Sequence, residues 1–439
     1  MTLATTVMGQ HPAPPPRVPN VPQRYVTISG SLCVASLLAL TACSSRAPEQ
    51  AAPTPQYLYL WTASADSTQP DFLAVLDVSQ TGGDSPGDSA RYGALVTTLP
   101  VPGLKIHPHH TEHQLAADRQ LFANGFGSGQ SFVFDLSDPG HPRIAAQFGD
   151  RAGYTHPHSF LRMPNGHVLG TFQMRHEGGK MLPGGLVEMT TTGEVVRSSS
   201  ADGPGIEPEQ RVYSAGIVTA LDRIVSTSTD MEKDYAVSRN LQLWRLSDLT
   251  LLKTFALPDG PRGNEGLLSA EPRLMADGKT LLVSTFNCGL YLVEGIDSDS
   301  PSARLVSSFP QKTGTSCAIP VISGHYYLVT VPAWSAVVCL DISDPTKPKE
   351  VSRVALGKDD VPHWISISPD QRRVVVTGYA GMKHRVVIAR FDSATGQLAI
   401  DGRFREEGAA ESGFRLDNKT WPHGGSAKGV PHGAVFSRP

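Results

Sequence analysis

The sequence predicts an all-β fold, a seven-bladed β-propeller closed by its C-terminal strand, from three observations. The dipeptide Pro-His recurs where predicted strands begin, although histidine makes up only 15 of the 439 residues. The segments 106–113 and 155–161 are two copies of one motif, separated by about the 40–50 residues that one propeller blade occupies. Finally, the chain ends in a lone strand, 431–437, whereas its first unit lacks one.

The predicted strands follow in order along the chain. The first unit holds three strands, at 57–62, 72–78 and 94–99. Six further units are predicted to open at Pro108-His109, Pro157-His158, Val212, Asn264-Glu265, Ser316-Cys317 and Pro362-His363. Each unit contains short runs of β-branched residues separated by Gly, Asp or Pro. The third strands of two units end alike, in Asp-Leu-Ser-Asp-Pro at 135–139 and Asp-Ile-Ser-Asp-Pro at 341–345, which suits an exit turn.

The C-terminal strand is predicted to become the innermost strand of the first blade. This pairing completes seven blades and leaves no open sheet edge. It also places four histidines on adjacent blades, because innermost strands converge on the propeller axis. These residues are His432 in blade one, His109 in blade two, His158 in blade three and His363 in blade seven.

These four histidines are the candidate metal ligands. Neutral imidazole is the commonest metal ligand in proteins, and the preceding proline restricts the backbone at each position. All-imidazole ligation suits Cu, Fe or Zn by donor type, and the ligand residues do not choose among these metals. Repeat-related structural residues and a metal-free polar pocket are the competing interpretations.

Other residues near the predicted openings receive secondary assignments. Glu265 opens blade five and is expected to accept the second N–H of a ligand histidine. Cys317 opens blade six, where a buried cysteine is favoured over a metal ligand. The remaining histidines near the two motif copies are assigned structural roles: His107, His110, His113 and His156.

The N-terminal segment resembles the export signal of bacterial lipoproteins. Arg17 and Arg24 precede an apolar run from 26 to 42, which ends in Leu-Thr-Ala-Cys at 40–43. We therefore expect a signal peptide at 1–42, lipidation of Cys43, a flexible linker at 43–56 and the propeller at 57–439. This predicts an extracytoplasmic protein held to a membrane by its lipid. Ser44 after the cysteine favours the outer over the inner membrane.

Composition limits the remaining function classes. The net charge is −3 at pH 7, and no basic cluster with interleaved aromatic residues is present, so nucleic acid is excluded as an expected partner. Three cysteines follow the proposed lipidation site, Cys288, Cys317 and Cys339. An oxidising compartment permits one disulfide among them, and the sequence leaves the pairing open.

The blade count, the histidine-rich strand openings and the Ser-Asp-Pro turns resemble the selenium-binding protein and methanethiol oxidase family. The resemblance covers residues 57–439 and implies a histidine-bearing seven-bladed propeller in which copper supports the oxidation of methanethiol. The chain departs from that family in having no cysteine between Cys43 and Cys288, where the family carries a cysteine-rich stretch. The four-histidine ring is also similar to carotenoid oxygenases, whose iron lies on a seven-bladed propeller axis.

Two function hypotheses follow. The first is an exported metalloenzyme in which the four histidines hold Cu or Fe and act on O₂ or a small sulfur substrate such as methanethiol. The second is a non-catalytic, surface-anchored propeller that binds a protein or polysaccharide partner. A quinoprotein dehydrogenase is a third, less favoured hypothesis. The sequence leaves both the metal and the substrate undetermined.

Overall fold

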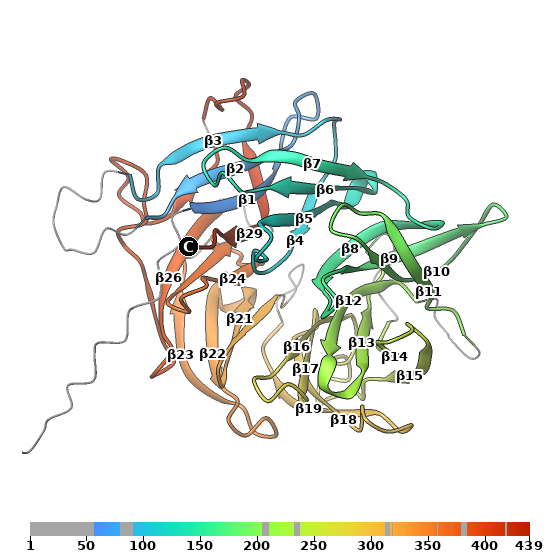
Figure 1. Ribbon diagram of the computed structural model, residues 1–439. Helices are drawn as coiled ribbons and strands as arrows, with labels where there is room; N and C mark the ends of the chain where they lie inside the picture. Colours follow the sequence, from blue (N-terminus) through green and yellow to red (C-terminus); the bar gives the residue numbers. More distant parts are fainter. Residues whose placement is uncertain are drawn as a thin grey trace, which may run out of the picture. The chain divides into compact units, whose positions relative to one another are not determined.

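The computed structural model describes residues 57–79, 91–203, 210–231, 238–311, 317, 319–357, 359–378, 384–417 and 419–439. Within these residues the strands form seven sheets, each built from antiparallel neighbours. The first strands of successive sheets contact one another in a closed circle, β29, β4, β8, β12, β16, β20, β24 and back to β29 (Figure 1). The predicted seven-bladed all-β propeller is confirmed. The predicted signal peptide, Cys43 and the linker lie outside the described residues.

Each blade holds four strands in the sheet order below, innermost first. Blade one contains β29 (Gly429–Phe436), β1 (Tyr57–Ser64), β2 (Phe72–Asp77) and β3 (Leu95–Pro100). Blade two contains β4 (Pro108–Thr111), β5 (Gln120–Gly125), β6 (Gln130–Asp135) and β7 (Arg143–Phe148). Blade three contains β8 (Tyr154–Arg162), β9 (Val168–Glu177), β10 (Lys180–Met189) and β11 (Val195–Ser200). Blade four contains β12 (Val212–Val218), β13 (Arg223–Ser228), β14 (Asn240–Arg245) and β15 (Leu251–Ala256).

The last three blades follow the same plan. Blade five contains β16 (Ser269–Leu274), β17 (Leu281–Thr285), β18 (Gly289–Glu294) and β19 (Ser302–Ser308). Blade six contains β20 (Pro320–Ser323), β21 (Tyr326–Val331), β22 (Ala336–Asp341) and β23 (Lys349–Ala355). Blade seven contains β24 (Ile365–Ile367), β25 (Arg373–Thr377), β26 (Arg385–Asp392) and β27 (Gln397–Ile400), with β28 (Phe414–Arg415) paired to β26. Among the described residues, three short 3₁₀ helices join strands, η1 (Phe126–Ser128), η2 (Thr219–Leu221) and η3 (Pro332–Trp334).

The C-terminal strand closes the circle, as predicted. Strand β29 pairs antiparallel with β1, from Leu58 opposite Phe436 to Ser64 opposite Gly429. The indole N–H of Trp364 in blade seven donates to the carbonyl of Ala434 at 2.9 Å, which ties the closing strand to the neighbouring blade. The first blade is therefore built from both ends of the described chain.

The innermost strands of blades five and six begin later than predicted. Strand β16 begins at Ser269, five residues after Asn264, and β20 begins at Pro320, three residues after Cys317. A turn precedes β16, in which Gly263 has a φ of 78°, a conformation that favours glycine. The predicted openings therefore fall in the connections before these strands.

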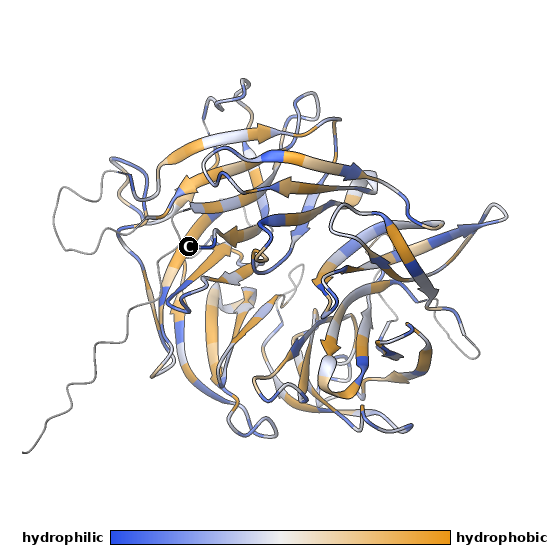
Figure 2. Ribbon diagram, in the orientation of Figure 1, coloured by the Kyte–Doolittle hydropathy of each residue, from blue (hydrophilic) through white to orange (hydrophobic). Residues whose placement is uncertain are grey.

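Apolar side chains between neighbouring blades form the core. Figure 2 shows that hydrophobic residues concentrate along the strands. The second and third strands are almost entirely buried, as in β2 and β25, whereas fourth strands such as β15 and β23 are only partly covered. Stacked blades thus bury both faces of their central strands and leave the outer edge to solvent.

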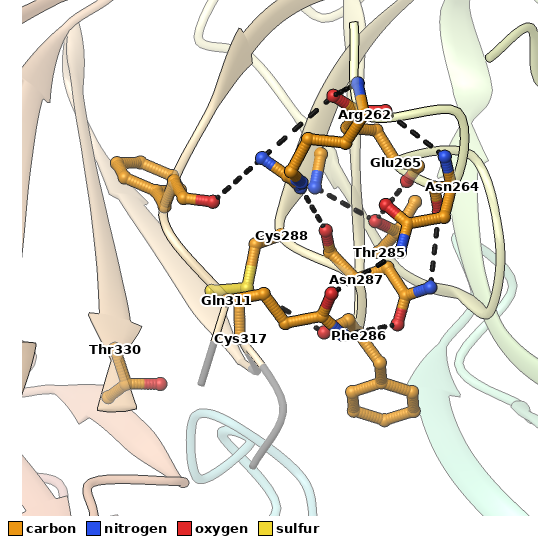
Figure 3. Close-up of a disulfide and its surroundings, with 12 residues drawn as sticks. Arg262, Asn264, Glu265, Thr285, Phe286, Asn287, Cys288, Gln311, Cys317 and Thr330 are labelled. Carbon is orange, nitrogen blue, oxygen red and sulfur yellow. Dashed lines mark hydrogen bonds and ion pairs between the residues drawn. A yellow bond between two sulfur atoms is a disulfide. The ribbon is translucent and has the colours of Figure 1, made fainter. Parts of the chain in front are cut away.

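A disulfide joins blades five and six. Cys288, directly before β18, is bonded to Cys317, which lies between β19 and β20, and their Cα atoms are 4.9 Å apart (Figure 3). Cys339 in β22 is a buried free cysteine. Because its sulfur is bonded to Cys288, Cys317 is not a metal ligand.

Among the described residues, no helix is long and apolar enough to cross a membrane.

Candidate metal centre

The innermost strands of five blades carry a bulge at the same position. In each, two consecutive residues lie opposite a single residue of the second strand, which shifts the pairing register by one. In blades one to five the paired bulge residues are His432-Gly433, His109-His110, His158-Ser159, Tyr213-Ser214 and Ala270-Glu271. The bulge breaks the strict alternation of a strand, so both members of a pair can approach the axis.

A polar side chain on the second strand holds each of three bulges. In blade two, Asn124 Oδ1 accepts a hydrogen bond from the backbone N–H of His110 at 2.6 Å, and Asn124 Nδ2 donates to the carbonyl of Pro157 in blade three at 2.7 Å. Thr171 and Thr227 play the same two roles in blades three and four. These side chains therefore fix the bulge and connect it to the next blade.

The bulges bring the histidines of blades one, two and three together. The rings of His109 and His110 stack with centroids 4.3 Å apart, and the ring of His432 lies 4.1 Å from that of His109. One nitrogen of each of these three rings lies within 4.8 Å of the others, which is the arrangement of residues that could hold a metal ion. The ring of His158 lies 4.8 Å from His109 and 4.3 Å from His110.

The fourth predicted ligand lies at the edge of this group. The ring of His363, just before β24, is 4.7 Å from the ring of His432. The carbonyl of His363 accepts a hydrogen bond from Thr330 in blade six at 2.9 Å, and that of His432 accepts one from Thr377 in blade seven at 2.9 Å. His109, His158, His363 and His432 thus share one cluster, here named the axial histidine cluster, together with His110.

Burial keeps the imidazoles of the axial histidine cluster neutral. His109, His110, His158 and His432 are at most 4% exposed. Desolvation, reinforced by the neighbouring rings, lowers the pKa of His109, His110 and His432 well below 6.5. Desolvation also lowers the pKa of His158 to about 3 and that of His363 to about 4. A neutral imidazole offers a lone pair, which is the form that binds metals.

Two buried ring nitrogens of the cluster have no hydrogen-bond partner within the described part of the chain, as expected of atoms that bind a metal. These atoms are Nδ1 of His109 and Nε2 of His158. Buried polar atoms without a partner are rare in folded proteins and call for an explanation, such as a bound ion. A group of imidazole nitrogens suits Cu, Fe or Zn by donor type. The residues present therefore fit a metal ion.

Aromatic side chains enclose the cluster. The ring of Tyr213 lies 3.7 Å from that of His158, and its hydroxyl is 3.4 Å from Nε2 of His110. The ring of Trp364 lies 4.9 Å from His110, and that of Phe126 lies 5.7 Å from His109. These walls keep the surroundings of the histidines apolar, which is the cause of their lowered pKa values.

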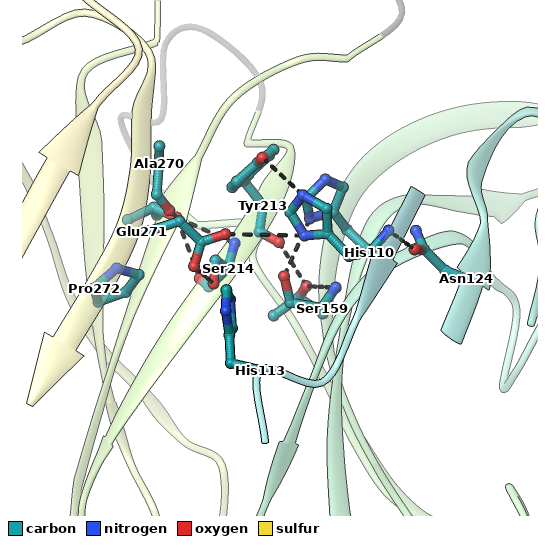
Figure 4. A network of polar contacts seen from close by, with 12 residues as sticks. His110, His113, Asn124, Ser159, Tyr213, Ser214, Ala270, Glu271 and Pro272 are labelled. Atoms are coloured by element: carbon teal, nitrogen blue, oxygen red, sulfur yellow. Dashed lines mark hydrogen bonds and ion pairs between the residues drawn. The ribbon is translucent and has the colours of Figure 1, made fainter. Parts of the chain in front are cut away.

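A carboxylate that the sequence did not single out faces the cluster. Glu271 Oε1 in blade five lies 3.9 Å from Nδ1 of His110 (Figure 4). Glu265 was expected in this role, but its carboxylate accepts hydrogen bonds from the backbone N–H groups of Arg262 and Asn264, at 2.8 and 3.3 Å (Figure 3). The expected contact between Glu265 and a ligand histidine is therefore absent among the described residues.

The other histidines near the two motif copies have different surroundings. His107 and His156 precede their Pro-His pairs with φ values of 62° and 55°, so both occupy the same left-handed position. His113 stacks on Trp364, and its Nε2 lies 2.7 Å from Nη2 of Arg273. Of the four histidines assigned structural roles, only His110 is among the residues grouped as a potential metal site.

Comparisons with known proteins agree with the fold. No protein-family model matches the chain. The chain is 26% identical over 347 residues to a methanethiol oxidase of Hyphomicrobium sp., covering 73% of this chain and 75% of that protein. A hypothetical selenium-binding protein from Sulfolobus tokodaii superposes with a TM-score of 0.68 at 18% identity, covering 88% and 94% of the two chains. A periplasmic gluconolactonase of Pseudomonas aeruginosa gives 0.56 at 14% identity, covering 87% and 99%.

These comparisons confirm part of the predicted resemblance. The chain is a seven-bladed propeller similar to methanethiol oxidase in sequence, as a distant homologue, and to a selenium-binding protein in fold. The two solved structures are less than 20% identical to it and bear on the fold alone.

Proposed function

We propose that this protein is a metal-dependent oxidoreductase that acts on methanethiol or another small sulfur compound. The observation that carries the proposal is the buried group of His109, His110 and His432, whose ring nitrogens lie within 4.8 Å of one another. The similarity to methanethiol oxidase supplies the substrate class.

Copper is the proposed metal, with iron as the alternative. A bound copper or iron ion would supply the one-electron redox chemistry that imidazole side chains lack. The axial histidine cluster would hold it through neutral nitrogens, and Tyr213, Trp364 and Phe126 would keep bulk water away. Zinc has no redox chemistry, so zinc in a closed, ligand-saturated site would favour the non-catalytic scaffold instead.

Metal content and oxygen uptake test this proposal together. We expect purified protein to contain about one copper or iron per chain and to consume O₂ when methanethiol is added. His141→Ala is the control for substitutions in the axial histidine cluster, because this side chain is 83% exposed and lies between β6 and β7. This variant should keep its metal. Wild-type protein that binds none of copper, iron or zinc after reconstitution would overturn the proposal, and so would metal-loaded protein without thiol-dependent O₂ uptake.

We further propose that the protein is exported and anchored by lipid at Cys43, at the outer rather than the inner membrane. The segment Leu-Thr-Ala-Cys at 40–43 supports this, and so does the Cys288–Cys317 disulfide, because structural disulfides persist in oxidising compartments. Replacing Cys43 by Ala should release the protein from the membrane fraction. Retention of this variant after salt and carbonate washes would contradict the anchor.

A further inference from the structure

Glu271 occupies a place in blade five that corresponds to the place of His110 in blade two. Each is the second residue of the bulge in its innermost strand. The side chains of Glu271 and His110 are 1% and 2% exposed, so neither relies on water for its polar contacts. The two bulges thus direct a carboxylate and an imidazole toward each other inside the propeller.

One oxygen of the Glu271 carboxylate is held without help from the axial histidine cluster. Oε2 accepts hydrogen bonds from the hydroxyl of Ser214 and from Nη1 of Arg273, both at 2.8 Å. The guanidinium of Arg273 is held in turn by the carbonyls of Pro272 and Pro320, both at 2.8 Å. The orientation of the carboxylate is therefore set by blades four, five and six.

The other oxygen is left without a donor. Oε1 of Glu271 is buried and has no hydrogen-bond partner among the described residues, while Nδ1 of His110 lies 3.9 Å away (Figure 4). That separation exceeds hydrogen-bond length by less than 1 Å. On the far side of the ring, Nε2 of His110 lies 3.4 Å from the hydroxyl of Tyr213.

A role confined to neutralising Arg273 leaves this arrangement unexplained. Oε2 alone makes the hydrogen bond with Arg273, and a buried acceptor without a donor destabilises the folded protein. A histidine that binds a metal through one nitrogen becomes a stronger donor at the other, and a carboxylate there fixes the ring and raises its basicity. Oε1 of Glu271 lies where such a carboxylate would be.

We propose that Glu271 is the positioning residue of the axial histidine cluster. With metal bound, its Oε1 would accept the Nδ1 proton of His110, which would fix the ring and leave Nε2 as the nitrogen available to the metal. This inference rests on the proposed metal site and adds to it the residue that selects the tautomer of His110. Ser214 and Arg273 act one step further out, by holding the carboxylate.

A double-mutant cycle on copper affinity tests the inference. Cu²⁺ is titrated against a competing chelator for wild type, Glu271→Gln, His110→Ala and the double variant. Loss of a carboxylate that orients a ligand typically lowers metal affinity 10–100-fold, and we expect that loss for Glu271→Gln. In the His110→Ala background we expect the same change to lower affinity less than about three-fold, since its effect acts through His110.

Glu188→Gln is the matched control. Glu188 in β10 is a buried carboxylate that also contacts an arginine and a histidine, Arg197 and His167. Its replacement should leave copper affinity unchanged. Ser214→Ala provides a second, milder variant, which removes one hydrogen bond from Oε2 and should lower affinity in the same direction as Glu271→Gln.

The possible results separate this inference from the proposed function. Wild type that binds copper, with Glu271→Gln binding it equally well, overturns the inference alone. If Glu271→Gln lowers copper affinity equally in the wild-type and His110→Ala backgrounds, the inference is also overturned, because Glu271 would then act independently of His110. Wild type that binds no metal overturns the proposed function and this inference with it. The electron paramagnetic resonance spectrum of the copper-loaded protein should change in Glu271→Gln and stay as in wild type in Glu188→Gln.

Discussion

The imidazole rings of His109 and His110, adjacent in the chain, lie parallel to within 2° with their centroids 4.3 Å apart. Adjacent residues of a regular strand point to opposite faces, so this stacking depends on the bulge in β4. The bulge depends in turn on Asn124, which binds the N–H of His110 and the carbonyl of Pro157. A second-strand side chain therefore controls which residues reach the axis.

Replacing Asn124 by Ala should weaken both folding and metal binding. It removes the side-chain hydrogen bonds to the N–H of His110 and to the carbonyl of Pro157, and a buried backbone group that is left without a partner costs about 1–3 kcal/mol. Thr285→Ala is the control, because Thr285 in β17 makes comparable buried hydrogen bonds to Glu265 and Gly289. Denaturant unfolding should show a lower free energy of unfolding in both variants. Metal analysis should show a lower metal content only in Asn124→Ala. Equal metal content in the two variants would contradict this role of the bulge.

The blade architecture could be predicted from the sequence because each blade repeats its own local signals. Strand periodicity, turn residues and blade spacing are properties of short segments, and the unpaired strand 431–437 had to close the ring. The bulges could not be predicted in this way. Period-two alternation places His109 and His110 on opposite faces, so only the register shift shows that both face the axis.

Glu271 was missed for a related reason. The sequence places the opening of blade five at Asn264-Glu265, but the chain first makes a turn and β16 begins at Ser269. The residue at the bulge is consequently Glu271. Where a strand begins within a loop-rich connection is decided by pairing with β17, and a single sequence carries little information about that pairing.

Alanine variants of the five histidines in the axial histidine cluster should differ in how much metal they retain. His109→Ala, His110→Ala and His432→Ala should each retain the least metal, because their nitrogens form the closest group. His158→Ala should follow them, since its ring contacts both His109 and His110. His363→Ala should lose less, because its ring contact is with His432.

Two histidines outside the axial histidine cluster serve as controls for this series. His141 lies between β6 and β7, and His384 lies directly before β26. Their alanine variants should keep the metal stoichiometry of wild type at neutral pH. Full metal in all five cluster variants would remove the cluster as the binding site.

Deleting residues 430–439 should cause early melting or aggregation. The deletion removes most of β29, exposes the edge of β1 and leaves the Trp364 indole without its acceptor at Ala434. His432→Ala is the control, because it removes the imidazole of His432 and keeps the strand. This variant should still unfold cooperatively. Thermal unfolding of the truncated protein at the wild-type temperature would show that closure is unnecessary.

Removing the Cys288–Cys317 disulfide should lower stability and leave the metal in place. The bond closes a loop with a sequence separation of 29, for which loop entropy predicts a loss of roughly 3–4 kcal/mol. A Cys288→Ala, Cys317→Ala double variant should show this loss in denaturant unfolding, whereas Cys339→Ala keeps the disulfide. Reduced copper content in the double variant would reopen the question of a cysteine ligand.

The metal-free protein should lose stability steeply as the pH falls below 6.5. Burial lowers the pKa of His158 to about 3 and that of His363 to about 4, whereas the same side chains titrate near 6.5 when unfolded. Between these values the unfolded state binds the protons, so stability is fully present above pH 6.5 and is lost as the pH falls toward the folded values.

Each such ring should lower the free energy of unfolding by about 1.4 kcal/mol per pH unit within that window. His158→Gln removes one of these rings, so the variant should lose roughly 2–3 kcal/mol less than wild type between pH 6.5 and pH 4.5. His141→Gln, at an exposed position, should follow the wild-type curve. Denaturant unfolding in chelator-treated buffers measures this difference, and a His158→Gln curve parallel to wild type would mean that His158 is protonated as readily in the folded protein as in the unfolded chain.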